Sequence, residues 1–143
     1  MLIRKEHISK GGILGIWKMD ESKEELLNLF PEPLLSQVNG YLKDIKSQRR
    51  LIEWLSTRIM LLYLLGEEKI IYNDKDGKPF LPDNTHQISV SHTNNYAAII
   101  LHRTLPVGID IETRSDRIKK VADKFISENE YIDKSQKTVH QLL

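Results

Sequence analysis

Two carboxylates stand close together in residues 107–112, which read Val-Gly-Ile-Asp-Ile-Glu. Successive side chains of a β-strand alternate between faces, so Asp110 and Glu112 would project to one side, roughly 7 Å apart along the strand. Ile109 and Ile111 would then point into a core. Adjacent carboxylates that both stay ionised usually hold a cation between them. Oxygen-only ligands favour Mg²⁺ or a similar hard ion. The pattern also fits a strand with one solvent-exposed face, so the rest of the chain must decide.

The composition excludes several classes of function. The chain has 143 residues, of which 40% are apolar and 29% charged, the balance of one globular domain. Its net charge of +1 gives no overall field for nucleic acid or membrane, so any basic site must be local. The absence of cysteine excludes disulfides, thiolate zinc sites and a cysteine nucleophile. No segment approaches the length of a membrane span and the N-terminus lacks a signal-peptide core, so we expect a cytoplasmic protein.

Apolar periodicity predicts a mixture of strands and helices, the α+β class. The strongest signal is a helix over residues 47–65, followed by Gly66 where a terminating glycine belongs. A further helix is expected to begin near Ser115. The other expected helices cover residues 24–30 and 34–45, the second interrupted at Asn39-Gly40, and the expected strands cover 11–19, 69–72, 87–92, 96–101 and 107–112.

Several basic side chains are candidates for binding an anion. Arg58 lies on the apolar stripe of the 47–65 helix, seven residues after Leu51. It is either an edge arginine whose stem crosses apolar neighbours or an arginine aimed at a bound anion. Lys46 and Arg50, with Arg49 between them, crowd the start of the same helix, either as a solvated face or as a phosphate site. His92 ends a strand, where a histidine can also be purely structural.

In this order the motifs resemble the 4′-phosphopantetheinyl transferases, and most closely the surfactin-synthetase-activating type. The resemblance covers roughly residues 45 to 131. It rests on five features in family order: Arg50 and Arg58 on one helix, Gly77-Lys78-Pro79, Ile-Ser-Val-Ser-His-Thr at 88–93, Val-Gly-Ile-Asp-Ile-Glu at 107–112, and Phe-Ile-Ser-Glu-Asn-Glu-Tyr at 125–131.

The resemblance implies an enzyme that moves the phosphopantetheine arm of coenzyme A onto a serine of an acyl or peptidyl carrier protein, with Mg²⁺. Asp110 and Glu112 match the acids that hold Mg²⁺ on the pyrophosphate. Glu112 or Glu130 would accept the serine proton, and the motifs leave open which. The residues matching coenzyme A contacts are Lys46 and Arg50 near the 3′-phosphate, Lys78 and His92 on phosphates, Ser91 and Pro79 in the nucleotide pocket, and Arg58 as a further donor.

The sequence departs from the family after residue 131. The family carries a later helix with a Trp-x-x-Lys-Glu pattern, whereas this chain has tryptophan only at positions 17 and 54. Family members consist of two similar α+β halves, so residues 1–105 match the first half and residues 106–143 only the start of a C-terminally truncated second. Three explanations follow: a fragment, self-association, or a degenerate member that binds coenzyme A or carrier protein without efficient catalysis. A non-catalytic binding module and an unrelated structural α+β protein remain alternatives.

Overall fold

The structure is a computed structural model that describes residues 1–8 and 10–111, and it confirms the α+β class. In the part of the chain that it covers, no helix is long and apolar enough to cross a membrane. The elements, in chain order, are β1 (Leu2–Ile8), β2 (Gly12–Lys18), α1 (Lys23–Leu27), α2 (Glu32–Leu42), α3 (Gln48–Leu65), β3 (Tyr72–Asn73), β4 (Pro79–Phe80), β5 (Gln87–His92) and β6 (Tyr96–His102).

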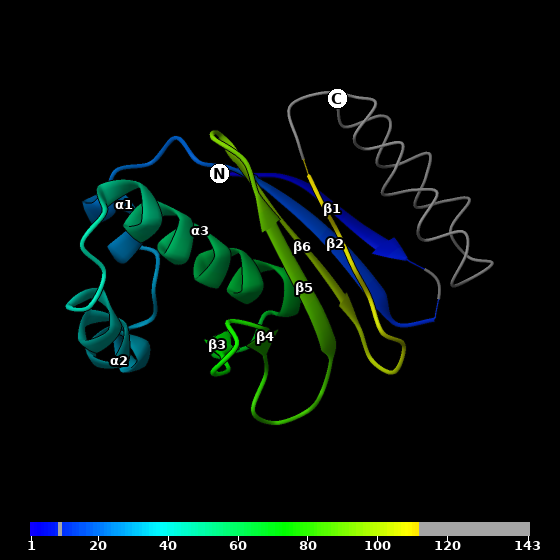
Figure 1. The fold of residues 1–143 in the computed structure, drawn as a ribbon. Coiled ribbons are helices and arrows are strands. Elements are labelled where there is room, and N and C mark those ends of the chain that lie inside the picture. The colour runs from blue at the N-terminus through cyan, green and yellow to red at the C-terminus, as the bar shows by residue number, and fades with distance from the viewer. Residues whose placement is uncertain (9, 112–143) are drawn as a thin grey trace.

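A four-stranded antiparallel sheet, in the order β1-β2-β6-β5, supports the site. The helices lie on one side of it, with α3 against the sheet and α1 and α2 beyond α3 (Figure 1). The sheet face toward α3 carries Trp17, Ala97, Ile99 and Leu101, which join the main core. Strands β3 and β4 form a small separate hairpin. Strand β5 is therefore an edge strand with one face toward the helices.

Helix α3 is capped at both ends, and its terminating Gly66 is the one that the sequence predicted. The side chain of Ser47 accepts a hydrogen bond from the backbone N–H of Arg50, and Gly66 ends the helix with a left-handed φ of 67°. The helix packs closely on β2, where a Cβ atom at Gly15 would lie 2.7 Å from Cδ2 of Leu64. Only glycine permits this approach, which brings the polar side chains of α3 near the sheet.

The structure differs from the expected elements in three places. Strand β1 was not expected, because its exposed and half-buried positions do not match its apolar and charged residues: Ile3 is exposed, while Arg4 and Glu6 are half-buried. The second helix runs from Glu32 to Leu42 without the expected interruption at Asn39-Gly40. It can include Pro33 because the N–H groups of the first turn have no intrahelical partner, so the proline loses no hydrogen bond there. The strand expected over 69–72 is reduced to Tyr72–Asn73, because Ile70 and Ile71 are buried without joining a ladder.

The strand predicted over residues 107–112 is wrong for 107–111, which have no strand assignment. The predicted alternation is nevertheless present: Asp110 is exposed, while Ile111 is buried and Ile109 half-buried. Both isoleucines pack on Ile16 and Ala98, on the sheet face opposite α3. Glu112, Glu130 and the helix expected near 115 lie outside the described residues. The division of the chain at residue 105 stays a prediction.

Candidate anion-binding pocket

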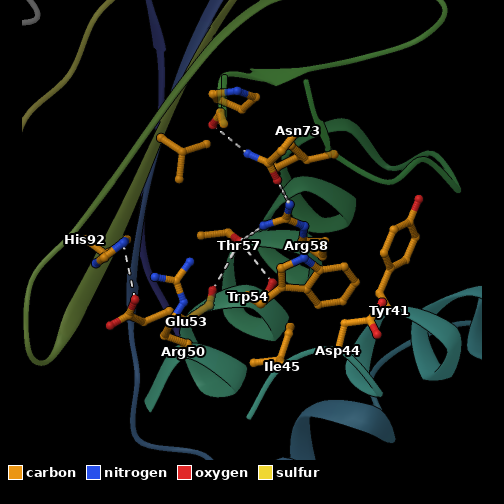
Figure 2. Close-up of a pocket in the computed structure, with 14 residues that line it drawn as sticks. Tyr41, Asp44, Ile45, Arg50, Glu53, Trp54, Thr57, Arg58, Asn73 and His92 are labelled. Carbon is orange, nitrogen blue, oxygen red and sulfur yellow. Dashed lines mark hydrogen bonds and ion pairs between the residues drawn. The ribbon is translucent and has the colours of Figure 1, made fainter. Parts of the chain in front are cut away.

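A pocket of about 500 Å³ opens between the end of α2, helix α3, the β3–β4 hairpin and the edge strand β5 (Figure 2). Its wall combines aromatic rings with charged and polar groups. This mixture suits a ligand with both an anionic and an aromatic part. The lining residues are Tyr41, Asp44, Ile45, Arg50, Glu53, Trp54, Thr57, Arg58, Ile71, Asn73, Gly77, Pro79, Val90 and His92.

Arg58 is the buried cation of this pocket, with only 6% of its surface exposed. Its guanidinium donates to Oγ1 of Thr57 at 2.9 Å and to Oδ1 of Asn73 at 2.6 Å, while Nε is buried without a hydrogen-bond partner. The Cζ atom stands 4.5 Å from the centroid of the Trp54 ring, a cation–π contact. Because the guanidinium is buried rather than reaching solvent, the edge-arginine interpretation is wrong.

No carboxylate pairs with Arg58 among residues 1–8 and 10–111. Both of its hydrogen-bond acceptors are neutral oxygens. Burial lowers the pKa of Arg58 to about 10, an effect that Tyr41 partly offsets. A buried positive charge without a counter-ion costs free energy, which an anionic ligand in the pocket would recover.

Glu53, which sequence reasoning missed, links the start of α3 to the end of β5. Its Oε1 lies 3.3 Å from Nε of Arg49, and its Oε2 lies 3.2 Å from Nε2 of His92. Arg49 also donates to the side chain of Asn94 in the turn after β5. The contact between Glu53 and His92, drawn in Figure 2, holds His92 at the pocket wall. The i, i+4 spacing of Arg49 and Glu53 was the available signal, but nothing local points to His92.

Three further residues of the pocket were also missed. Trp54 precedes Arg58 by four residues, a spacing that brings the two side chains onto one helix face. Asn73 holds the β3–β4 hairpin by donating from Nδ2 to the carbonyl of Gly77 at 3.0 Å while accepting from Arg58. Tyr41 packs on Trp54 with ring centroids 5.5 Å apart. Of these, only the tryptophan–arginine spacing could have been read from the sequence.

The structure gathers four of the predicted coenzyme A contacts around one pocket. Arg50, Arg58, Pro79 and His92 all line it, although they come from three different segments. The side chain of Arg50 is exposed and makes no hydrogen bond or ion pair within the described residues. The pocket wall thus holds two arginines and a histidine.

Three predicted contacts lie outside the pocket wall. Lys46 and Lys78 are exposed, and Lys78 directly adjoins the lining residue Pro79. Ser91 faces away from the pocket: it follows Val90 and precedes His92 on β5, so its side chain points to the opposite face.

Asp110 also lies on the far face of β5. Its Oδ1 accepts a hydrogen bond from the hydroxyl of Ser91 at 3.3 Å. Its side chain is exposed, and no group of three or more histidine or acidic side chains within the described ranges could by itself hold a metal ion. Asp110 and the pocket therefore flank one edge strand from its two sides.

Comparison with known proteins supports the resemblance drawn from the motifs. Over 95 residues the chain is 34% identical to the 4′-phosphopantetheinyl transferase gsp of Aneurinibacillus migulanus. The resemblance to the 4′-phosphopantetheinyl transferases is confirmed. The aligned region is 64% of this chain and 39% of the transferase, so the chain spans well under half of that relative. No family model matches the chain.

Proposed function

We propose that this chain binds coenzyme A and acts in transfer of its 4′-phosphopantetheine arm to a serine of an acyl or peptidyl carrier protein. The observation that carries the proposal is Arg58, a buried guanidinium at a pocket wall without a carboxylate partner among the described residues. Similarity to a phosphopantetheinyl transferase supports the choice of ligand.

Coenzyme A carries a pyrophosphate, a 3′-phosphate and an adenine ring, and the pocket offers complementary groups. Arg50, Arg58 and His92 supply donors for phosphate oxygens, and charge-assisted hydrogen bonds of this kind are strong and directional. Tyr41 and Trp54 supply aromatic surface at the same wall. Lys46 and Lys78 would reach the ligand from outside the wall, because lysine stems are long and both are exposed.

Asp110 and Glu112 would hold Mg²⁺ on the phosphate oxygens of the donor. Asp110 fits this role, since its carboxylate is exposed and oxygen donors suit a hard cation. When bound, the ion supplies charge neutralisation for displacement at phosphorus. Glu112 or Glu130 would accept the proton of the attacking serine. The chain's own contribution is to align donor and acceptor, which is most of what such a displacement requires.

We further propose that residues 1–105 correspond to the first α+β half of the transferase fold and residues 106–143 to the start of the second. The passage of residues 107–111 onto the sheet face opposite α3 supports this division, because the chain leaves the first layer after β6. The pocket and Asp110 would then lie near the junction of the two halves.

The test has two arms on the same folded chain. Calorimetry with coenzyme A measures binding, and incubation with coenzyme A, Mg²⁺ and an apo carrier protein, followed by mass spectrometry of the carrier, measures transfer. We expect the wild-type chain to bind coenzyme A and to transfer the arm, and we expect Arg58→Met to weaken binding at least tenfold. Binding without transfer would identify a non-catalytic coenzyme A-binding member, and the absence of binding would refute the proposal.

A further inference from the structure

The segment that carries Asp110 is held by side chains rather than by strand pairing. The backbone N–H of Ile109 donates to Oγ of Ser89 at 3.1 Å, and that of Ile111 donates to Oγ of Ser91 at 3.0 Å. The two donors and the two acceptors are each spaced by two residues. The serine hydroxyls of the edge strand β5 thus take the place that backbone carbonyls occupy in a sheet.

Ser91 makes a second contact with the same segment. Its hydroxyl accepts from the N–H of Ile111 and donates its own hydrogen to Oδ1 of Asp110 at 3.3 Å. A hydroxyl has one hydrogen and two lone pairs, so it can serve both partners at once. One oxygen of Asp110 is thereby oriented by Ser91, and Oδ2 is left for another ligand.

His102 holds the turn that leads into this segment. Its Nδ1 accepts from the backbone N–H of Thr104 at 3.1 Å and from that of Leu105 at 3.0 Å. An imidazole nitrogen that accepts two hydrogen bonds carries no hydrogen, so the ring is the Nε2–H tautomer. The ring is buried, with 5% exposed, and burial lowers the pKa of His102, which keeps it neutral.

These contacts set which residue of the segment faces solvent. Burial of Ile109 and Ile111 opposes a slip by one residue, which would turn Asp110 into the apolar cluster. The hydrogen bonds to Ser89 and Ser91 hold the N–H groups of Ile109 and Ile111 against β5. The turn held by His102 sets how far the chain reaches before it meets these serines, so the contacts together keep this register.

We propose that Ser89, Ser91 and His102 are positioning residues that fix the register of residues 107–111, and that Ser91 orients the Asp110 carboxylate toward a divalent cation. The cation part rests on the proposed function. Ser91 thus acts from the far face of β5, and not as a wall of the nucleotide pocket.

Amide hydrogen exchange of the ligand-free chain tests the anchoring without any activity. Removing the acceptor leaves a partly buried N–H without a partner, and the folded segment then bears the full cost of desolvating that group. We therefore expect Ser89→Ala to speed exchange at Ile109, and Ser91→Ala at Ile111, each by roughly fivefold or more. Ser36→Ala, an exposed serine on α2, is the matched control and should change neither amide. Unchanged exchange in both β5 variants would overturn the proposal.

Mn²⁺ binding, followed by water proton relaxation in the presence of coenzyme A, tests the orientation of Asp110. We expect Ser91→Ala to weaken Mn²⁺ binding about three- to tenfold, Ser91→Thr to restore it because the hydroxyl remains, and Asp110→Asn to abolish it. Equal Mn²⁺ affinity in wild type and Ser91→Ala would overturn the role of Ser91. A wild type that binds neither coenzyme A nor Mn²⁺ would instead refute the proposed function and the cation part together, while the exchange data still decide the anchoring.

Discussion

Replacing Arg58 by methionine should weaken ligand binding while it leaves the free energy of unfolding nearly unchanged. Methionine fills a similar elongated space without a charge, so the buried cation disappears while most of the packing on Trp54 remains. Ordinary large-to-small changes at buried positions cost about 2–5 kcal/mol. We expect Arg58→Met to behave differently, because the wild-type side chain brings an uncompensated charge into the core.

The magnitude follows from the contacts. Burial lowers the pKa of Arg58 to about 10, which at about 1.36 kcal/mol for each pKa unit corresponds to roughly 3 kcal/mol against the charged form. Hydrogen bonds to Thr57 and Asn73 offset this, since bonds to a charged donor contribute about 1.5–3 kcal/mol each in general. The cation–π contact with Trp54 adds about 0.5–2 kcal/mol. Because both acceptors are neutral, the lower ends of these ranges apply, and together they come to about 3.5 kcal/mol against the cost of roughly 3 kcal/mol, so we expect the free energy of unfolding to change by no more than about 1 kcal/mol.

Urea denaturation at pH 7, with and without coenzyme A, measures both effects. A ligand at one hundred times its Kd stabilises a protein by about 2.7 kcal/mol, and we expect Arg58→Met to lose most of that gain. Arg50→Met, the exposed arginine of the same pocket, is the matched control: it should weaken binding with no change in the ligand-free protein. A ligand-free loss above about 3 kcal/mol in Arg58→Met, or an intact coenzyme A effect, would refute the reasoning.

The sign of the pH dependence gives an independent check on Arg58. Folding lowers the pKa of Arg58 to about 10, so above about pH 10 the unfolded chain binds more protons than the folded chain. The stability of wild type relative to Arg58→Met should therefore rise as pH increases through this range. A difference that stays constant with pH would show that the guanidinium is not held in a desolvated state.

Three further predictions concern stability. A hydrogen bond from Lys69 is the main cause that lowers the pKa of Asp83 to about 2, so the contribution of Asp83 to stability is present above pH 4 and lost as pH falls toward 2. In Asp83→Asn, the urea concentration at the unfolding midpoint should therefore depend less on pH over that range. A pH dependence equal to that of wild type would contradict this. Gly40→Ala, within α2 and with open space at its Cβ, should raise the free energy of unfolding by about 0.5–1 kcal/mol. At Gly66 the space is equally open but φ is +67°, so Gly66→Ala should lower the free energy of unfolding by about 1 kcal/mol. Thermal denaturation measures both glycine variants, and equal effects of the two would disprove the backbone argument.

Local patterns predicted much of the fold because they report local physics. The 47–65 helix and its terminating Gly66 were predicted from apolar spacing and cap chemistry, and both are present. The strands around residues 12–18, 87–92 and 96–102 were also predicted. The strand over 107–111 failed because its N–H groups find side-chain acceptors on β5, and a sequence does not show which acceptor a backbone donor will meet.

The sequence by itself determined the family resemblance, the α+β class and the four pocket residues Arg50, Arg58, Pro79 and His92, because motif order and periodicity are written along the chain. Only the tertiary structure decided that Arg58 is buried without a carboxylate partner in the described residues, that Glu53 pairs with His92, and that Ser91 serves Asp110 on the far face of β5. These depend on contacts between residues 19 to 39 positions apart or on desolvation. The desolvation of Arg58 and the Glu53–His92 contact arise only when α3 packs against the sheet and excludes water, and the Ser91–Asp110 contact arises only when residues 107–111 pack on the opposite face of the sheet.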